Sequence, residues 1–254
     1  STSPSSTPAD LREFAMQALI LAGGKGTRLR PYTTVFPKPL MPVGDMPILE
    51  IILRQLKRAG VEEIILACGY MGQMFQAFFQ DGARLGLKID YSYENEPLGT
   101  AGPVALALDR MKGNFLVMNG DLLTTLDYRK LYDAHGASGA AATIGLYSRE
   151  VKIDFGVVQA DAAGDLASYT EKPVYHFDVS MGVNVLDPAV VRPFLKAGEY
   201  LDIPQLMMNL RAAGKRVHCF RSPCYWLDIG RIDDYQTANE IFESRKAEFL
   251  PEGD

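Results

Sequence analysis

The chain has 254 residues, of which 47% are hydrophobic and 22% are charged, with a formal net charge of −5 and a pI near 5.3. This globular composition allows one large α/β domain, and the acidic balance excludes a broad basic surface that would attract nucleic acid or an anionic membrane. No apolar run reaches the length of a membrane span, and we expect a cytoplasmic protein whose three cysteines stay reduced.

Strands and helices alternate in the first half of the chain. Residues 1–10, rich in Ser and Pro, are expected to be a disordered tail, and residues 11–254 a single domain without a linker. Apolar runs predict strands over 18–21, 64–67, 87–93 and 114–118, and helical spacing predicts helices over 48–59, 73–79 and 104–111. This order indicates a mostly parallel sheet with helices on both faces.

The second half adds hairpins to this α/β frame. Strands are predicted over 140–147, 156–159, 167–170 and 181–186, and helices over 188–195 and 203–213. Residues 217–221 and the segment up to Trp226 are expected to close the sheet, before an amphipathic helix over 232–246. The fold class is therefore α/β, with a Rossmann-like mixed sheet flanked by helices.

A loop rich in glycine and basic residues follows the first strand. Glycine tolerates positive φ and lets a ligand approach the main chain, so several N–H groups can face one anion. Lys25, Arg28 and Lys38 add positive charge in an otherwise acidic chain, which fits a triphosphate; the alternative is a tight turn with solvated basic side chains. Prolines at 31, 37, 39 and 42 exclude a regular helix here, and the spacing matches neither a P-loop nor a dinucleotide-binding motif.

Two acidic residues follow apolar strands. Asp121 ends the run Asn119-Gly120-Asp121 after the strand at 114–118, and Asp228 follows Trp226-Leu227. A carboxylate at the carboxyl end of a buried strand lies over the cleft, where a hard cation binds. The alternative is that each acid caps a turn or a helix, and Asp228 precedes the last predicted helix.

Six motifs in order along residues 17–242 resemble the sugar-1-phosphate nucleotidyltransferase family, with mannose-, heptose- and amino-sugar-1-phosphate guanylyltransferases the nearest likeness: G-G-x-G-T-R, P-K-P, P-L-G-T-A-G, N-G-D, E-K-P and W-L-D-I-G. The resemblance implies a nucleotide-diphospho-sugar transferase fold for residues 11–254, without the β-helix tail of some relatives. It implies Mg²⁺-dependent transfer from a nucleoside triphosphate to a sugar 1-phosphate, with release of pyrophosphate.

The resemblance also assigns roles to individual residues. Asp121 and Asp228 would hold Mg²⁺, Arg28 the β,γ-phosphates, Lys38 the α-phosphate region and Lys172 the incoming phosphate. The nucleotide-binding residues would be Leu21, Ala22, Gly23, Gly24, Lys25, Gly26, Thr27, Glu94, Pro97, Gly99, Thr100, Asn119 and Gly120. The acceptor-binding residues would be Gly156, Glu171, Lys172, Ser180 and Gly182.

The base and the sugar are less strongly specified than the reaction. A carboxylate at Glu94 accepts the two adjacent donors of guanine, which favours GTP, whereas a solvated acid at the end of a strand is the alternative. Glu171-Lys172 could equally be a surface ion pair. Ser180, Met181 and Asn184 depart from the N-A-G-x-Y pattern of the family, which leaves the sugar open.

Three alternatives remain open. Some members of the resembling family are regulatory subunits that bind a sugar nucleotide without making it, and others run the same reaction with dTTP, CTP or UTP. A redox dinucleotide protein is a more distant alternative. We expect neither nucleic acid nor membrane as a partner, and the sequence leaves a homo-oligomer open.

Overall fold

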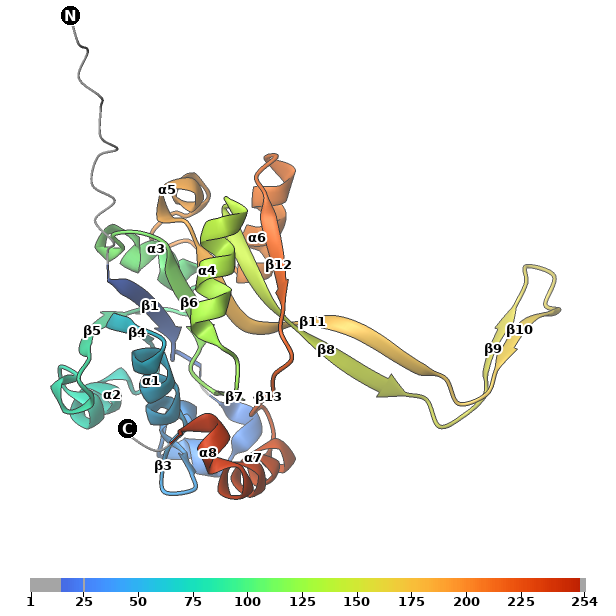
Figure 1. Ribbon diagram of the computed structural model, residues 1–254, viewed down its shortest axis with the longest axis horizontal. Coiled ribbons are helices and arrows are strands. Elements are labelled where there is room, and N and C mark those ends of the chain that lie inside the picture. The colour runs from blue at the N-terminus through green and yellow to red at the C-terminus, as the bar shows by residue number, and fades with distance from the viewer. Residues whose placement is uncertain (1–14, 25, 252–254) are drawn as a thin grey trace, which may run out of the picture.

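The computed structural model describes residues 15–24 and 26–251 (Figure 1). The expected tail at 1–10 and Lys25 lie outside these residues. The main sheet has the strand order β12-β8-β11-β6-β1-β4-β5. Its strands are β1 (Met16–Leu21), β4 (Val61–Cys68), β5 (Lys88–Tyr93), β6 (Phe115–Asn119), β8 (Ala142–Lys152), β11 (Val174–Leu186) and β12 (Val217–Arg221). Strands β1, β4, β5 and β6 are parallel, β12 is parallel to β8, and β11 is antiparallel to both β6 and β8, which confirms the predicted mixed sheet.

Helices cover both faces of the sheet (Figure 1). One apolar layer includes residues of α1 (Ile48–Arg58), α2 (Gly72–Phe79), α4 (Tyr128–Ser138), α7 (Ile232–Ser244) and α8 (Lys246–Phe249). The other includes residues of α3 (Gly102–Ala107), α5 (Pro188–Val191) and α6 (Ile203–Ala212). In β1, Ala18 and Ile20 pack into the first layer and Leu19 into the second, so both faces of this strand are buried. That is why its sequence is a continuous apolar run.

The segment up to Trp226 does not close the sheet as expected. Strand β12 forms the edge alone and ends at Arg221, because Pro223 has no N–H to continue a ladder. The chain then forms β13 (Trp226–Asp228), which pairs with β7 (Leu122–Thr124) in a separate two-stranded ribbon. A second small ribbon joins β2 (Pro42–Val43) and β3 (Met46–Pro47), and the described strands form no β-helix.

Three predicted helices are shorter than their apolar pattern. The helix expected over 104–111 is α3 followed by a 3₁₀ turn at Leu108–Arg110. The helix expected over 188–195 is α5 followed by a 3₁₀ turn at Arg192–Phe194, which contains Pro193. The terminal helix is interrupted at Arg245, between α7 and α8.

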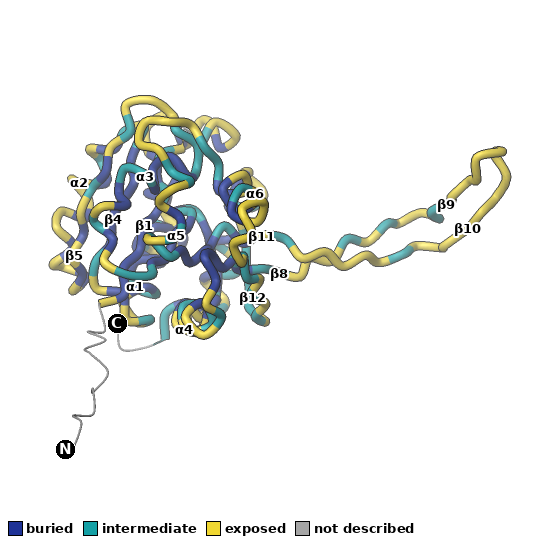
Figure 2. Tube along the Cα trace, turned by 90° about the horizontal axis from the view of Figure 1, so that it is seen from above, coloured by how far each residue is buried: buried dark blue, intermediate teal, exposed yellow. Residues whose placement is uncertain are grey.

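A long ribbon, which we call the arm (residues 148–180), projects from the body (Figure 1). It is built by the outer parts of β8 and β11, and its tip is the hairpin of β9 (Val157–Ala160) and β10 (Leu166–Thr170). The strands expected near 156–159 and 167–170 therefore exist, but they pair only with each other. Most of the arm is exposed (Figure 2).

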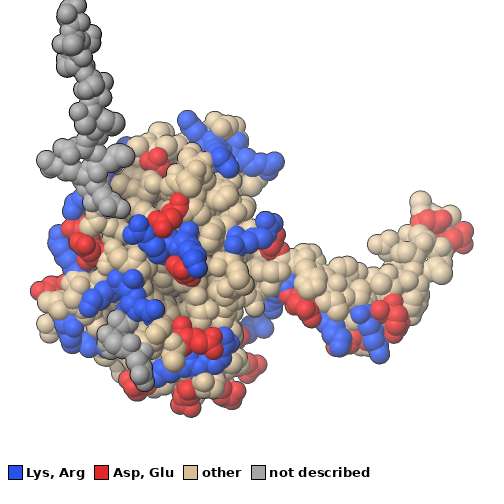
Figure 3. Space-filling model, viewed as in Figure 1, with Lys and Arg blue, Asp and Glu red and all other residues tan. Residues whose placement is uncertain are grey.

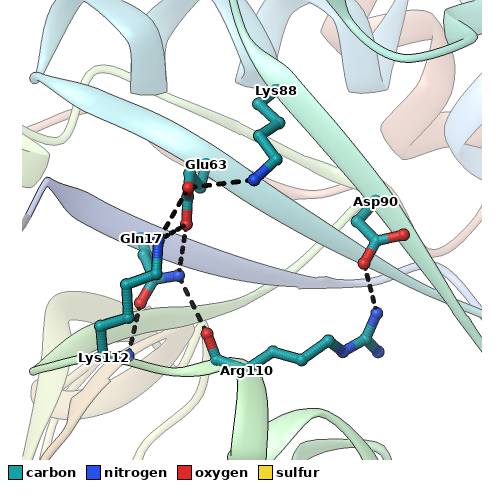
Figure 4. Close-up of polar contacts among 6 residues, drawn as sticks. All are labelled: Gln17, Glu63, Lys88, Asp90, Arg110 and Lys112. Atoms are coloured by element: carbon teal, nitrogen blue, oxygen red, sulfur yellow. Dashed lines mark hydrogen bonds and ion pairs between the residues drawn. The ribbon is translucent and has the colours of Figure 1, made fainter.

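The amino-terminal ends of the central strands are held by a closed polar network (Figure 4). The buried side chain of Gln17 donates to Glu63 at 2.8 Å and to the carbonyl of Arg110, and it accepts from the N–H of Lys112. Glu63 also pairs with the ammonium groups of Lys88 and Lys112. These groups satisfy one another's hydrogen bonds, so the network ties β1, β4 and β5 together at this end of the sheet.

No helix among the described residues could cross a membrane.

Candidate active site

The glycine-rich loop after β1, which we call the phosphate loop because it is predicted to bind phosphate, lies near Asp121. Both are at the carboxyl ends of parallel strands, at one edge of the sheet. The loop after β1 contains only short 3₁₀ turns, as its prolines predict. It is anchored by the N–H of Ala22, which donates to Ala67 of β4, and by the carbonyl of Leu21, which accepts from Gly120 after β6. Gly26 begins the first turn with φ of 57° and accepts from the Thr33 hydroxyl at 2.7 Å.

Glycines of this loop differ in what surrounds them. A Cβ at Gly23 would lie 2.6 Å from a carboxylate oxygen of Glu94, which also lies against Gly69 at the end of β4. At Gly24, by contrast, no described atom outside its chain neighbours would lie within 4 Å of a Cβ. The structure thus brings Glu94 to the loop and leaves the approach to Gly24 open.

Lys38 joins the two predicted metal acids. Its ammonium lies 2.5 Å from Asp121 Oδ2 and 3.7 Å from Asp228 Oδ1, so the carboxylates can be no farther apart than the sum of those distances. Asp121 follows β6 and Asp228 ends β13, and the pairing of β13 with β7 brings them together. The Lys38 side chain is 9% exposed, so its stem is packed while its charge faces the acids. The structure thus places Asp121 and Asp228, which are far apart in the sequence, on either side of one ammonium group.

The surroundings of the Asp228 carboxyl group disfavour its ionised form. Burial raises its pKa above the ordinary value, and the neighbouring charge of Asp121 raises it further. Lys38 and Arg28 oppose these effects by favouring the ionised form. A cation or a cationic side chain next to this pair is therefore stabilising.

Arg28 reaches Asp228 from the phosphate loop. Its guanidinium lies against Gly230, and it lines a cavity of about 550 Å³ with Trp226 and Asp228. The other wall is the start of α7, where Asp234 accepts from the N–H groups of Gly230 and Arg231.

A second cavity, of about 270 Å³, opens on the other side of Asp228. Predicted residues Leu21, Thr100, Asn119, Ser180 and Gly182 line it. Of the other lining residues, Met181 and Asn184 belong to the stretch compared with the N-A-G-x-Y pattern. Sequence reasoning assigned the remaining ones to no site: Val117, Leu122, Ile203, Pro204 and Trp226.

Asn184 is the most informative of these lining residues. Its residue is only 3% exposed, and its Oδ1 has no hydrogen-bond partner among the described residues. A buried carbonyl oxygen without a donor is costly, unless a ligand supplies one. A polar residue at 184, within an otherwise apolar strand, was the available signal in the sequence.

The loop after β5 is fixed by one contact within the loop and by contacts with residues 201–203. The N–H of Leu98 donates to Glu94 at 3.1 Å, closing the turn that contains Pro97. Gly99 has φ of 76°, and a Cβ there would lie 2.5 Å from the Leu201 carbonyl oxygen. The Thr100 hydroxyl donates to Asp202 and accepts from the N–H of Ile203 at the start of α6.

The remaining predicted acceptor-binding residues lie away from both cavities. Gly156, Glu171 and Lys172 line neither of these cavities and lie on the arm, in the connections that join β8 and β11 to the β9–β10 hairpin (Figure 1). A Cβ at Gly156 would clash with the Tyr169 hydroxyl, so this glycine permits packing against the β9–β10 hairpin. Lys172 has φ of 45°, an uncommon conformation for a lysine.

Comparison with known proteins identifies the family. The family model described as nucleotidyl transferase matches residues 17–245. The chain belongs to this family. Among its relatives, the probable mannose-1-phosphate guanylyltransferase 1 of Oryza sativa subsp. japonica is 35% identical over 236 residues, covering 89% of this chain and 64% of the relative. The UTP–glucose-1-phosphate uridylyltransferase of a Synechocystis strain is 30% identical over 242 residues, covering 88% of this chain and 62% of that one. This chain thus spans less than two thirds of the length of these curated relatives.

Solved structures of this family have the same fold. A putative glucose-1-phosphate thymidylyltransferase from Bacillus anthracis, in complex with a sucrose, matches with a TM-score of 0.72 and 25% identity over 89% of this chain and 95% of that one. HddC from Yersinia pseudotuberculosis, complexed with GMP-PN, matches with a TM-score of 0.68 and 26% identity over 89% of this chain and 99% of that one.

Proposed function

We propose that this nucleotidyl transferase joins a nucleoside triphosphate, with GTP favoured, to a sugar 1-phosphate and releases pyrophosphate. The observation that carries the proposal is Lys38 held between Asp121 and Asp228 beside the glycine loop. The named guanylyltransferase relatives and the GMP-PN complex of HddC support a guanine nucleotide, whereas the uridylyltransferase relative shows that the base varies within the family.

The reaction needs positioned charge more than a general base. A phosphate monoester is already largely dianionic at neutral pH, so one of its oxygens can attack the α-phosphorus while pyrophosphate leaves in line. The barrier arises from repulsion between two anions and from charge growing on the leaving group. The positive charge of Lys38 reduces the repulsion at the α-phosphate. Arg28 stabilises the charge that grows on the leaving group, at the β,γ-phosphates.

Asp121 and Asp228 are the residues that would hold Mg²⁺. Two neighbouring carboxylates of like charge, one of them with a raised pKa, are stabilised by a divalent cation. No group of three or more acidic, His or Cys ligands exists among the described residues, which suits an ion that completes its shell with phosphate oxygens and water. When bound, Mg²⁺ would offset phosphate charge during the transfer.

Glu94 supports the choice of guanine. One of its oxygens accepts from Leu98 and the other lies against Gly23 and Gly69, so the carboxylate faces the loop that would receive the nucleotide. A carboxylate in this place accepts the two adjacent donors of guanine. Glu94→Gln would therefore weaken GTP discrimination rather than abolish turnover.

The 270 Å³ cavity is the proposed acceptor pocket. Asp228 and Trp226 border it, and the unsatisfied Oδ1 of Asn184 is available to accept from a sugar hydroxyl. Ser180 and Gly182 add polar and main-chain surface at its rim.

Pyrophosphate release tests the function directly. The protein is mixed with Mg²⁺ and each of the four nucleoside triphosphates, against a panel of sugar 1-phosphates. We expect release with GTP and one or a few acceptors, and an Asp121→Asn variant that folds normally but is inactive. Binding of a sugar nucleotide without any release across the grid would instead identify a regulatory subunit and overturn the proposal.

A further inference from the structure

The arm has one apolar face and one polar face. The paired residues of β8 and β11 place Tyr147, Val151, Tyr175, Phe177 and Val179 on the same side, interrupted only by Arg149. The opposite side carries pairs such as Glu150 with His176 and Ser148 with Asp178. Such alternation is typical of a strand with one face buried, yet Phe177 is 53% exposed.

This apolar face leads directly to the candidate active site. The Tyr175 and Phe177 rings lie 6.3 Å apart on the arm, and at its base the Tyr147 ring lies 5.4 Å from that of Trp226. Trp226 lines both cavities beside Asp228. A molecule lying along this face would therefore extend to the mouth of the acceptor pocket.

The arm is poorly suited to bend back over the candidate active site of its own chain. Its two strands stay paired without interruption from Ser180 with Leu146 to Val174 with Lys152, and the register shift lies at the base, between Ser180 and Asn184. Six residues at about 3.3 Å each carry the tip roughly 20 Å outward along this ladder. Bending back would break ladder hydrogen bonds that have no replacement.

The exposed apolar area matches what a dimer buries. At about 150–250 Å² for a large side chain, the exposed fractions sum to on the order of 700 Å² per copy, close to the roughly 800 Å² per partner of a stable interface. The contributing side chains are Phe155, Val158, Leu166, Tyr169, Tyr175 and Phe177. In Figure 3 the charged side chains of the arm lie along one edge and at the tip, and the rest of the shaft is uncharged in that view.

We propose that the arm docks along the arm of a second copy of this chain, in a two-fold dimer that buries the face of Tyr175 and Phe177. Every copy carries the same face, so an isologous contact is self-complementary and closed. In an antiparallel pair of arms, each tip lies beside the base of the other. Each acceptor pocket then receives the tip of the partner's arm.

This arrangement accounts for the position of Lys172. Under the proposed function, on which this step rests, Lys172 binds the incoming sugar phosphate. It follows β10 on the projecting arm, however, whereas Asp121 and Asp228 lie beside β7 and β13 in the body (Figure 1). Exchange of arms delivers Lys172 and Glu171 to the partner's pocket and completes each site from two copies.

Sedimentation tests the docking surface. We expect the 28.0 kDa chain to sediment as a dimer at micromolar concentration and Phe177→Ser to sediment as a monomer. His176→Ser, at the adjacent position on the polar face, is the matched control and stays dimeric. A wild-type monomer, or a Phe177→Ser protein that remains fully dimeric with an unchanged thermal melt, overturns the proposal.

A heterodimer tests the shared site. Asp121→Asn and Lys172→Ala chains, each inactive as a homodimer under the proposed function, are co-expressed with different tags and purified through both. Arm exchange gives one complete site per heterodimer and about half the wild-type turnover, whereas arms that serve their own chain leave both sites dead. An inactive heterodimer overturns the exchange. A fully active Lys172→Ala homodimer instead removes Lys172 from the proposed mechanism, and sedimentation still decides whether the arms dock.

Discussion

Replacing Lys38 by Met isolates the charge that joins the two acids. The side chain keeps its apolar stem but loses an ammonium 2.5 Å from Asp121 and 3.7 Å from Asp228. Two unit charges at about 4 Å attract by about 1 kcal/mol in a water-like medium and about 4 kcal/mol at an effective dielectric constant of about 20. Because the Asp228 side chain is 47% exposed, solvent screening favours the lower part of that range. We expect Lys38→Met to lower the free energy of unfolding by about 1–2 kcal/mol at neutral pH.

The sign of the pH dependence is fixed by the raised pKa of Asp228. Without Lys38 that pKa rises further, so the native state retains a proton that the unfolded chain has already released. The destabilisation of Lys38→Met relative to the wild type is therefore greatest at neutral pH. It shrinks as the pH falls toward 3.8, the ordinary pKa of an aspartate. Urea unfolding at neutral pH and at about pH 4.5 measures it.

A matched control loses an exposed lysine charge. Lys246→Met removes an ion pair to Asp45 whose side chains are 47% and 67% exposed, and we expect little change in the free energy of unfolding at either pH. Equal destabilisation of Lys38→Met at both pH values would refute the reasoning, because it would indicate lost packing rather than unpaired carboxylates.

Four further substitutions separate the roles of the site. Asp121→Asn should lower turnover by about 10²–10³-fold in a pyrophosphate assay, while circular dichroism shows an unchanged fold. Gly24→Ala should leave the free energy of unfolding within about 0.5 kcal/mol but raise the KM for GTP, whereas Gly26→Ala, at a φ of 57°, should cost about 1 kcal/mol or more. Asn184→Leu should raise the KM for the sugar 1-phosphate by about 3- to 10-fold and leave that for GTP unchanged.

The sheet and the position of Asp121 could be predicted because they follow from local rules. Buried parallel strands are continuous apolar runs, and their carboxyl ends share one edge, so a residue just after Asn119 had to lie at that edge. Glu94 could be placed near the loop for the same reason, since β5 is parallel to β4.

Other parts depended on contacts between distant segments. Lys38 reaches both acids through a loop without regular structure, and no periodicity specifies where such a loop runs. Asp228 depends on the pairing of β13 with β7, a three-residue strand too short to show a pattern. The arm did leave a signal, because Tyr175, Phe177 and Val179 alternate with polar residues, but that alternation could not show that β11 leaves the body.

The glycines of the phosphate loop show how packing separates positions that one motif treats alike. Gly23 is required because any side chain would meet the carboxylate of Glu94, and Gly26 is required by its left-handed backbone and by Thr33. These two glycines would be needed in this fold whether or not a nucleotide binds. Gly24 has ordinary backbone geometry and open space where a Cβ would lie, so nothing in the described structure demands a glycine there. A ligand that approaches the main chain is the remaining physical reason for it, and the case for an anion at this loop therefore depends on Gly24 more than on the length of the glycine run.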